Sequence, residues 1–304
     1  MTLGVVITAC AEPDLPSTLA SLHATAPNIP VVVVNDGGRS PIGDNPWIKQ
    51  IRTEQLVGVG PARTIGVEAC ETDYVLTIDA HMRFTSNWYA SAIAFLEKHP
   101  TAVHCAACLG LDAKHPSVDA PNAVYHGATI NFYGPDRQVR GKTQVWEAVW
   151  AKEQPGDDYE LAAPLGASYF VPREWFLRTQ PLRYLHRWGC DEIQLGLKAW
   201  LSGIEVRMMK PVRIGHRWRS GKILPFRLSP ADILYNKLFG ILTILPKEYQ
   251  SRILPKFKRD GAFNIAMRII KEDWHLIEQE RVLNRRLFVR EFQWILDRFQ
   301  LPFP

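Results

Sequence analysis

The first 110 residues alternate short, continuous apolar runs with helical patterns, and this alternation constrains the fold most. Apolar runs without polar interruption are typical of parallel strands that are buried on both faces. The expected strands are residues 5–9, 31–34, 48–52 and 74–78, and the expected helices are 14–26, 61–70 and 86–99, the last capped by Ser86. In such a sheet, ligands bind beyond the carboxyl ends of the strands. The pattern therefore predicts an α/β fold whose site lies near Ala9, Glu12, Asp36 and Asp79.

The middle third of the chain has a different pattern. Strand-like segments separated by loops rich in Gly, Pro and Asp occur at 103–108, 125–132 and 143–150, which predicts antiparallel additions to the sheet. A strand at 167–171, helices at 173–178 and 191–201 and a strand at 204–209 are expected next. Beyond Ser229 the pattern is helical, with breaks at Pro246, Pro255 and Gly261. We therefore expect a mixed sheet flanked by helices in residues 1–220, and a helical C-terminal extension in residues 221–304.

Charge is distributed unevenly along the chain. Residues 1–204 contain 16 Lys and Arg against 21 Asp and Glu, whereas residues 205–304 contain 20 against 10. The basic part is also rich in aromatic residues, and charges interleaved with flat rings suit a polyanion such as DNA. The basic side chains expected to face phosphates are Lys256, Lys258, Arg259, Arg285 and Arg286. The alternative is a set of amphipathic helices whose rings form core and whose charges face water.

The sequence also limits where the protein works. Its longest uncharged apolar run near the C-terminus is 238–246, nine residues, about half the length of a bilayer-spanning helix. No basic segment precedes the opening apolar run, and the five Cys show no repeated CxxC spacing. We expect a cytoplasmic protein without a transmembrane segment. Residues 238–245, on a basic background, could still lie on an anionic membrane surface.

Asp79 and His81 directly follow a buried strand and are the first candidates for metal binding. A carboxylate and an imidazole two residues apart can bind one divalent ion, and this donor set suits Mn²⁺ or Mg²⁺, with imidazole favouring Mn²⁺. Residues of these types also cap loops without any ligand. Asp36, after the strand at 31–34, could likewise form a turn or accept a hydrogen bond from a base or ribose.

Three further segments contain candidate site residues. Arg63 lies in a glycine-rich segment that opens a helix near the strand ends, and Asp191 and Glu192 begin a helix beside Trp188. The segment 215–219 adds a second imidazole, His216, and cations for phosphate oxygens.

Seven segments of this chain resemble, in order, the motifs of GT-A glycosyltransferases. The similarity covers residues 3–219 and is greatest to family 2 enzymes and to the catalytic domain of polypeptide N-acetylgalactosaminyltransferases. The segments are VVITAC, VVVVNDGG, GVGPARTIG, YVLTIDAHMRF, LGASYFVPREWF, WGCDEIQLGLKAWLSG and IGHRWR. The resemblance implies a GT-A type mixed sheet that binds a nucleotide-sugar.

The resemblance also implies roles for individual residues. Asp36 would contact the uridine of a UDP-sugar, and Ala9, Glu12 and Arg63 would lie in the same donor site, although Glu12 could be an ordinary loop charge. Asp79, His81 and His216 would hold the metal, and Arg219 would reach the diphosphate. The residues beside the donor sugar would be Gly166, Ala167, Trp188 and Gly189, with Asp191 and Glu192 as the catalytic candidates.

One motif departs from the family pattern. Polypeptide transferases usually have Gly-Gly-Glu-Asn where this chain has Gly189-Cys190-Asp191-Glu192. If one of the two carboxylates deprotonates the acceptor, the sugar is transferred with inversion, and if it only supports the anomeric centre, retention is possible. The sequence leaves both outcomes open.

Together these observations predict a metal-dependent glycosyltransferase that moves a sugar from a UDP-sugar to a hydroxyl group. The basic C-terminal part favours a hydroxymethylated base in DNA as the acceptor, reached by base flipping. A cell-surface saccharide or a lipid-linked acceptor is the alternative. Two other classes are a sugar nucleotidyltransferase, which would need a glycine-rich first loop that residues 9–13 lack, and a non-catalytic nucleic-acid-binding protein.

Overall fold

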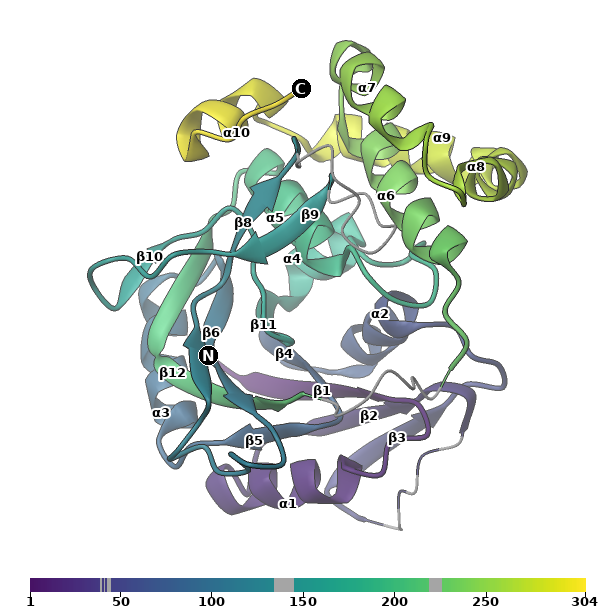
Figure 1. The fold of residues 1–304 in the computed structure, drawn as a ribbon. Coiled ribbons are helices and arrows are strands. Elements are labelled where there is room, and N and C mark those ends of the chain that lie inside the picture. Colours follow the sequence, from purple (N-terminus) through teal and green to yellow (C-terminus); the bar gives the residue numbers. More distant parts are fainter. Residues whose placement is uncertain (39, 41, 43–44, 134–144, 219–225) are drawn as a thin grey trace.

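The chain folds around a large mixed sheet (Figure 1). This computed structural model describes residues 1–38, 40, 42, 45–133, 145–218 and 226–304. Within them, the main sheet has the order β10-β12-β6-β11-β4-β1-β2-β3, with β5 paired to β12 and β7 to β6. Its strands are β1 (Leu3–Ala9), β2 (Val31–Asn35), β3 (Ile48–Arg52), β4 (Tyr74–Asp79), β5 (Met82–Phe84), β6 (Val103–Leu111), β7 (Ala123–Tyr125), β10 (Asp158–Glu160), β11 (Ser168–Pro172) and β12 (Val206–Arg217). A separate two-stranded sheet joins β8 (Ala128–Asn131) to β9 (Glu147–Trp150).

The predicted mixture of strand directions is present. Strands β3, β2, β1 and β4 are parallel, and β11 lies antiparallel between β4 and β6. The segment 125–132, expected as one strand, is divided into β7 and β8 at Gly127, whose φ of 63° is left-handed. Strand β12 runs parallel to β6 well past the expected end at residue 209, with a bulge between Met209 and Arg213.

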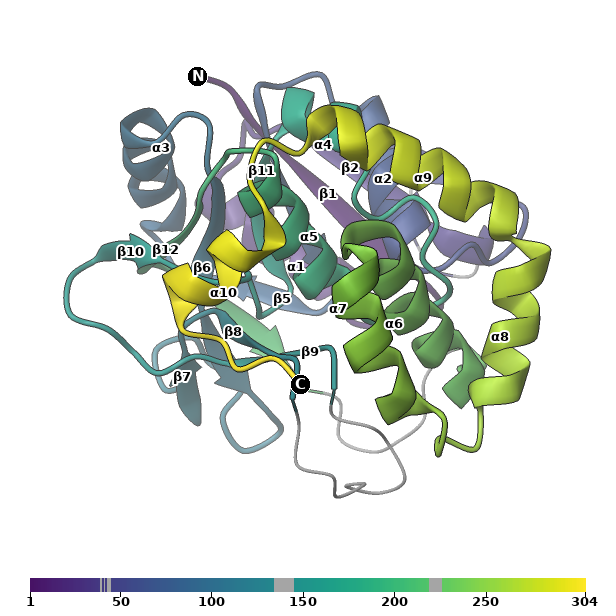
Figure 2. The same cartoon turned by 90° about the horizontal axis from the view of Figure 1, so that it is seen from above.

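Ten α-helices cover the sheet in the part of the chain that the structure describes. Figures 1 and 2 show α1 and α3 apart from the other helices, which lie on the opposite side of the sheet. The first five are α1 (Leu15–Thr25), α2 (Val59–Ala69), α3 (Trp88–Lys98), α4 (Arg173–Thr179) and α5 (Asp191–Leu201). The C-terminal five are α6 (Pro230–Ile244), α7 (Lys247–Ile253), α8 (Phe263–Glu272), α9 (Trp274–Leu287) and α10 (Phe292–Phe299).

One predicted helix cap is wrong. Helix α3 begins at Trp88, its N-cap residue is Asn87, and no side chain accepts a hydrogen bond from the first turn. The Ser86 hydroxyl instead donates to Asn87 Oδ1, at 2.9 Å. Ser86 therefore has the residue type of a cap but lies one residue too early.

Each strand of the sheet contributes to two cores because successive side chains point to opposite faces. In β1, Val5 and Ile7 pack with α1 and α3, whereas Val6 packs with α2 on the other face. This explains why β1 and β2 are apolar along almost their whole length. The polar residues Asn35 and Asp79 lie at the ends of β2 and β4.

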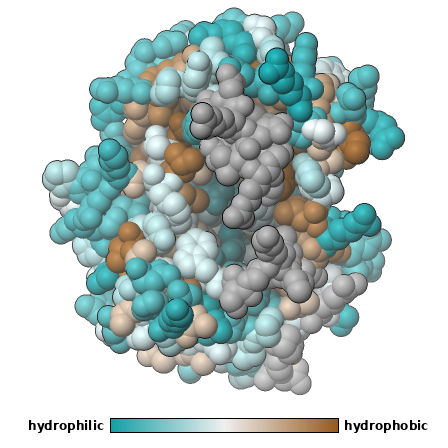
Figure 3. All heavy atoms as spheres, viewed as in Figure 1, coloured by the Kyte–Doolittle hydropathy of each residue, from teal (hydrophilic) through white to brown (hydrophobic). Residues whose placement is uncertain are grey.

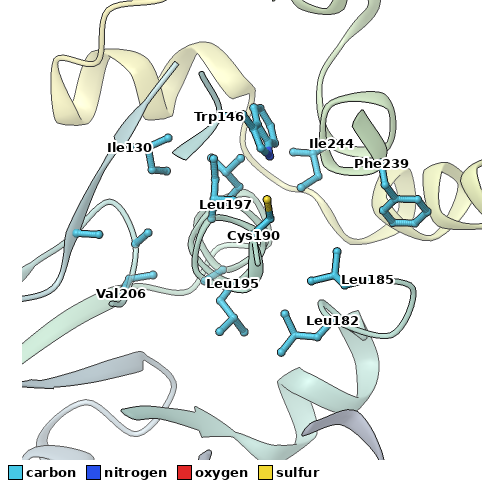
Figure 4. Packing of buried hydrophobic residues seen from close by; sticks show 14 of the residues in the cluster. Ile130, Trp146, Leu182, Leu185, Cys190, Leu195, Leu197, Val206, Phe239 and Ile244 are labelled. Atoms are coloured by element: carbon cyan, nitrogen blue, oxygen red, sulfur yellow. The ribbon is translucent and has the colours of Figure 1, made fainter. Parts of the chain in front are cut away.

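The C-terminal helices share the second of these cores. Figure 4 shows Phe239 and Ile244 of α6 and Leu197 of α5 among the residues of one core, and all three side chains are buried. Residues 238–245 are therefore part of the protein interior. The expectation that this stretch lies on a membrane surface is therefore wrong. A helix in the core and a helix at a membrane surface are both apolar, so the sequence pattern does not distinguish them. Among the described residues, no helix has the length and apolarity needed to cross a bilayer.

A buried ion pair joins α5 to α9. Lys198 Nζ donates to Glu280 Oε1 and to the carbonyl of Thr179, the latter at 3.0 Å, and both charged side chains are almost fully enclosed. Burial lowers the pKa of Lys198, and the charge of Glu280 opposes that shift. Because a desolvated charge is stable only beside its partner, this pair should be sensitive to loss of either member.

Replacing Lys198 with Met should lower the free energy of unfolding by about 3–5 kcal/mol, since it leaves the Glu280 carboxylate buried and unpaired. The double variant Lys198→Met/Glu280→Leu should recover most of that loss. Urea denaturation measures both. Lys98→Met is the matched control, because Lys98 pairs with Asp158 at the surface, where ion pairs contribute about 0–1 kcal/mol. A double variant no more stable than Lys198→Met would contradict this account.

Candidate functional site

Asp79, His81 and His216 come together at one end of the sheet. Asp79 ends β4, His81 lies in the turn before β5, and His216 is near the end of β12, opposite Met82 in the β5–β12 pairing. One ligand atom from each residue lies within 4.8 Å of the other two. The two imidazole Nε2 atoms are 3.1 Å apart, and Asp79 Oδ2 is 3.6 Å from that of His216 and 3.8 Å from that of His81. The three predicted metal ligands are thus grouped.

Glu12 fixes the orientation of one of these imidazoles. Its Oε2 lies 3.2 Å from His81 Nδ1, and a carboxylate there accepts a hydrogen bond from that nitrogen. His81 Nε2 is then left with its lone pair directed at His216 and Asp79. Carboxylate–histidine pairs of this kind are typical second ligand shells of metal sites. The buried Glu12 carboxylate is therefore more than an ordinary loop charge.

The donor set suits a divalent transition metal. One carboxylate and two imidazoles suit Mn²⁺ in particular, because all three groups can direct a lone pair at the same cation. Burial opposes ionisation of Asp79, but the hydrogen bond from His216 and the charge of Arg63 outweigh it and hold the pKa of Asp79 well below its usual range. Asp79 is therefore ionised, as a metal ligand must be.

Arg63, on α2, links the metal-ligand group to the candidate catalytic carboxylates. Its Nη2 donates to Asp79 Oδ1 at 2.8 Å, and its Nη1 donates to Asp191 Oδ2. The guanidinium also lies 5.0 Å from the centre of the Tyr169 ring. Burial works against its charge, but the two carboxylates outweigh burial and raise the pKa of Arg63 further. Arg63 was expected in the donor site, and its terminal nitrogens are paired with carboxylates there.

Asp191 and Glu192 begin α5 and differ sharply although they are neighbours. Asp191 is buried against Arg63, whereas Glu192 Oε1 accepts a hydrogen bond from the Tyr169 hydroxyl at 2.9 Å. Burial, and then the neighbouring charge of Asp191, raise the pKa of Glu192 well above its usual range. A buried carboxyl group with a raised pKa is typical of catalytic sites.

Asp36 organises the backbone between the end of β2 and the start of α2. Its Oδ1 accepts hydrogen bonds from Val57 N and Thr53 Oγ1 at 2.7 and 3.0 Å, and its Oδ2 accepts one from Gly58 N at 2.9 Å. The carboxylate thus fixes the entry into α2. Together with Ala9, which ends β1, Asp36 lines a cavity beside the metal-ligand group.

Two cavities meet at the metal-ligand group. The first, about 240 Å³, is lined by the end of β1, Glu12, Asp36 and the start of α2. The second, about 540 Å³, is lined by Arg63, Gly166, Ala167, Asp191 and Glu192. The residues that border both cavities are Asp79, His216, Trp188 and Trp218. A ligand that crosses from one cavity to the other must pass the metal-ligand group.

Backbone geometry explains the glycines at the second cavity. Gly166 has a φ of 110°, and a Cβ there would lie 2.6 Å from Cys108 Cβ, so only glycine fits. Gly189 has a φ of 101° and faces open space. The remaining expected donor residue, Arg219, lies outside the described residues, although the adjoining Trp218 borders both cavities.

Sequence reasoning missed two residues of the site. Tyr169 lies two positions after Ala167, but Ala167 has a φ of 58° and precedes β11, so alternation along the strand does not assign the two residues to one face. Asn236, on α6, hydrogen-bonds the loop that carries Trp188 and Gly189, and nothing in the apolar helical pattern around it indicates such a contact.

The comparisons with known proteins agree with this geometry. Residues 4–114 match the sequence model of glycosyl transferase family 2. This N-terminal part of the chain is therefore similar to family 2 glycosyltransferases. Polypeptide N-acetylgalactosaminyltransferase 8 of Drosophila melanogaster is 26% identical over 94% of the chain and 49% of the relative. Probable N-acetylgalactosaminyltransferase 7 of Caenorhabditis elegans is 27% identical over 81% of the chain and 40% of the relative.

Solved structures extend the similarity over all or nearly all of the chain. GalNAc-T7 with UDP, GalNAc and Mn²⁺ superposes with a TM-score of 0.72 at 17% identity, covering 100% of this chain and 59% of that one. S. aureus TarS 1-349 in complex with UDP-GlcNAc gives 0.56 at 15% identity, over 93% of this chain and 79% of that one. The expected GT-A type sheet is confirmed. The chain spans about half or less of the length of the curated relatives named here.

Proposed function

We propose that this protein transfers a sugar from a UDP-sugar to a hydroxyl acceptor, with Mn²⁺ or Mg²⁺ bound by Asp79, His81 and His216. The observation that carries the proposal is the position of these three ligands where two cavities meet. A nucleotide-sugar has the same order of parts: a nucleoside, a diphosphate that binds a divalent cation, and a sugar. The uridine would occupy the cavity beside Ala9 and Asp36, and the sugar the cavity beside Gly166 and Ala167.

The chain's own residues supply the rest of the chemistry. Bound metal would neutralise the charge that grows on the departing diphosphate. Asp191, which is paired with Arg63, would stabilise positive charge that develops on the sugar ring. Glu192, with its raised pKa, is the carboxyl group suited to exchange a proton in the second cavity. Tyr169 would hold Glu192 in place through the hydroxyl that donates to it.

The relatives favour an N-acetylhexosamine as the sugar. The matching curated proteins are named as N-acetylgalactosaminyltransferases, and the two superposed structures contain UDP with GalNAc or UDP-GlcNAc. UDP-GalNAc and UDP-GlcNAc are therefore the first donors to test.

The DNA acceptor expected from the sequence has no support. Phe239, Phe257 and Phe292, which would have to stack on bases, are buried in the core. Two exposed rings, Trp274 and Trp294, are covered by the guanidinium groups of Arg281 and Arg290. Figure 3 shows hydrophobic residues in separate groups among hydrophilic ones on the face it draws. The second interpretation of the C-terminal part, amphipathic helices with aromatic cores, accounts for these rings.

The test of this function is metal-dependent binding of UDP. We expect UDP with Mn²⁺ to raise the melting temperature clearly, because a ligand at about 100 times its Kd adds about 2.7 kcal/mol of stability. UDP with EDTA should give little or no shift. Release of UDP from UDP-GalNAc or UDP-GlcNAc, followed with and without Mn²⁺, would then identify the donor. No metal-dependent shift, or Mn²⁺ and UDP in a crystal with His216 directed elsewhere, would overturn the proposal.

A further inference from the structure

The loop that carries Trp188 has an unusual backbone. Arg187, Gly189 and Cys190 all have left-handed φ angles, of 48°, 101° and 70°. A non-glycine residue in that region is strained and persists only where its surroundings hold it. The side chain of Trp188, 47% exposed, borders both cavities next to the metal-ligand group. The conformation of this loop therefore decides the shape of the site.

The amide of Asn236 holds that loop from α6. Its Oδ1 accepts a hydrogen bond from His186 N at 2.6 Å. Its Nδ2 donates to the carbonyls of His186, Gly189 and Trp188, at 2.8, 3.0 and 3.3 Å. Asn236 is fully buried. The backbone N–H of His186 needs an acceptor and the three carbonyl groups need a donor, so the oxygen and the nitrogen of the side-chain amide can be told apart.

Neighbouring contacts hold the same loop from two sides. The ring of Tyr235, adjacent to Asn236, stacks on His186 with centroids 3.7 Å apart. On the other side, Val59 N, at the start of α2, donates to the carbonyl of Arg187 at 2.7 Å. The loop is thus fixed between α2, which lies in the family-matched part of the chain, and α6, which lies outside it.

We propose that Asn236 is a positioning residue for the transfer reaction. Acting through the backbone of residues 186–189, it sets Trp188 at the junction of the cavities and so orients the donor sugar toward Asp191 and Glu192. This inference rests on the proposed function. Helix α6 has this role in addition to packing, because a residue needed only for packing would have no reason to place an amide against four backbone groups of a single loop.

The test compares two isosteric changes of buried asparagines. Asn236→Asp keeps the acceptor for His186 N but replaces the donating amide with an oxygen that faces three carbonyls. Asn284→Asp is the matched control: Asn284, on α9, is equally buried, and its Nδ2 donates to the carbonyl of Thr243, away from both cavities. We expect Asn236→Asp to reduce kcat with UDP-GalNAc or UDP-GlcNAc about 10- to 100-fold, as misplacement of reacting groups does. Asn284→Asp should stay within about threefold of the wild type in this assay, even if it unfolds more easily.

A second comparison asks whether Asn236 acts through Trp188. In a Trp188→Ala background, Asn236→Asp should cause less than about a threefold further loss, because residues acting in one chain of contacts are not additive. Amide hydrogen exchange supplies a readout that needs no activity. Exchange of residues 186–190 should be faster in Asn236→Asp and unchanged in Asn284→Asp. If Asn236→Asp does not fold, Asn236→Ser, which removes the same donors, is measured in its place.

The outcomes separate this inference from the proposed function. A wild-type protein that shows no Mn²⁺-dependent shift with UDP overturns the function, while faster exchange of residues 186–190 in Asn236→Asp still supports the positioning of the loop by Asn236. Equal kcat and equal exchange in the Asn236 and Asn284 variants overturn the positioning role. If Asn236→Asp and Trp188→Ala each reduce kcat and the double variant shows the product of the two reductions, Asn236 does not act through Trp188.

Discussion

Asp79→Asn should abolish Mn²⁺-dependent binding of UDP and lower sugar transfer by at least about 1,000-fold, since the charge stabilisation that a metal supplies to a leaving group amounts to several kcal/mol. The amide keeps the shape of the side chain but removes the anionic ligand that His216 and Arg63 hold ionised. Thermal shift with UDP and Mn²⁺, followed by measurement of UDP release, gives both quantities.

The control for this variant is Asp112→Asn. Asp112 also accepts several hydrogen bonds, from His115 and Asn122 among others, but it borders neither cavity. Its replacement should leave the UDP-induced shift and the activity close to those of the wild type. A full Mn²⁺-dependent shift in Asp79→Asn would show that the cation is bound elsewhere.

The second large effect is expected at Arg63. Arg63→Met leaves the carboxylates of Asp79 and Asp191 without their buried partner, and should lower the free energy of unfolding by about 3–5 kcal/mol. Arg63→Lys should also be poorly tolerated, because one ammonium group does not reproduce two nitrogens that bind two separate carboxylates. Denaturation in EDTA measures the effect without metal.

The loss of stability at Arg63 should depend on pH. In the wild type the pKa of Asp79 is depressed, so its contribution is present above the unfolded pKa of about 3.9 and disappears as the pH falls through the folded value. The difference between wild type and Arg63→Met should therefore be larger at neutral pH than in acid. The double variant Arg63→Met/Asp191→Asn should regain part of the stability. The control Arg173→Met should lose little stability, because the Arg173 guanidinium donates to backbone carbonyls of α2 near the surface. A pH-independent loss would argue against the electrostatic origin.

Local pattern was sufficient to predict much of the fold and part of the site. The strands that end at Ala9, Asn35 and Asp79 are short apolar runs, and their polar ends lie together because parallel strands finish at one edge. Asp79 and His81 are close in sequence, so their proximity needs no knowledge of the fold. His216 could be joined to them only through resemblance to a family, because the pairing of β12 with β5 has no local signature.

Other features depend on contacts between distant segments and were not predictable in this way. The pairing of Arg63 with both Asp79 and Asp191 requires α2, β4 and α5 to meet. The hydrogen bond from His81 to Glu12 requires the loops after β1 and β4 to lie side by side. Asn236 is one polar residue in an apolar helix, and only its position against residues 186–189 gives it a role.

The bulge in β12 changes which residues of the strand face each side of the sheet. Before it, the even-numbered Val206 and Met208 face the core that contains α5, whereas after it Ile214 faces the core that contains α1 and α3. The number of extra residues between Met209 and Arg213 is odd, so odd- and even-numbered residues exchange faces of the sheet there. His216 has the same parity as Ile214. In a regular strand through the same residues, without the bulge, its imidazole would lie on the opposite face of the sheet, away from Asp79.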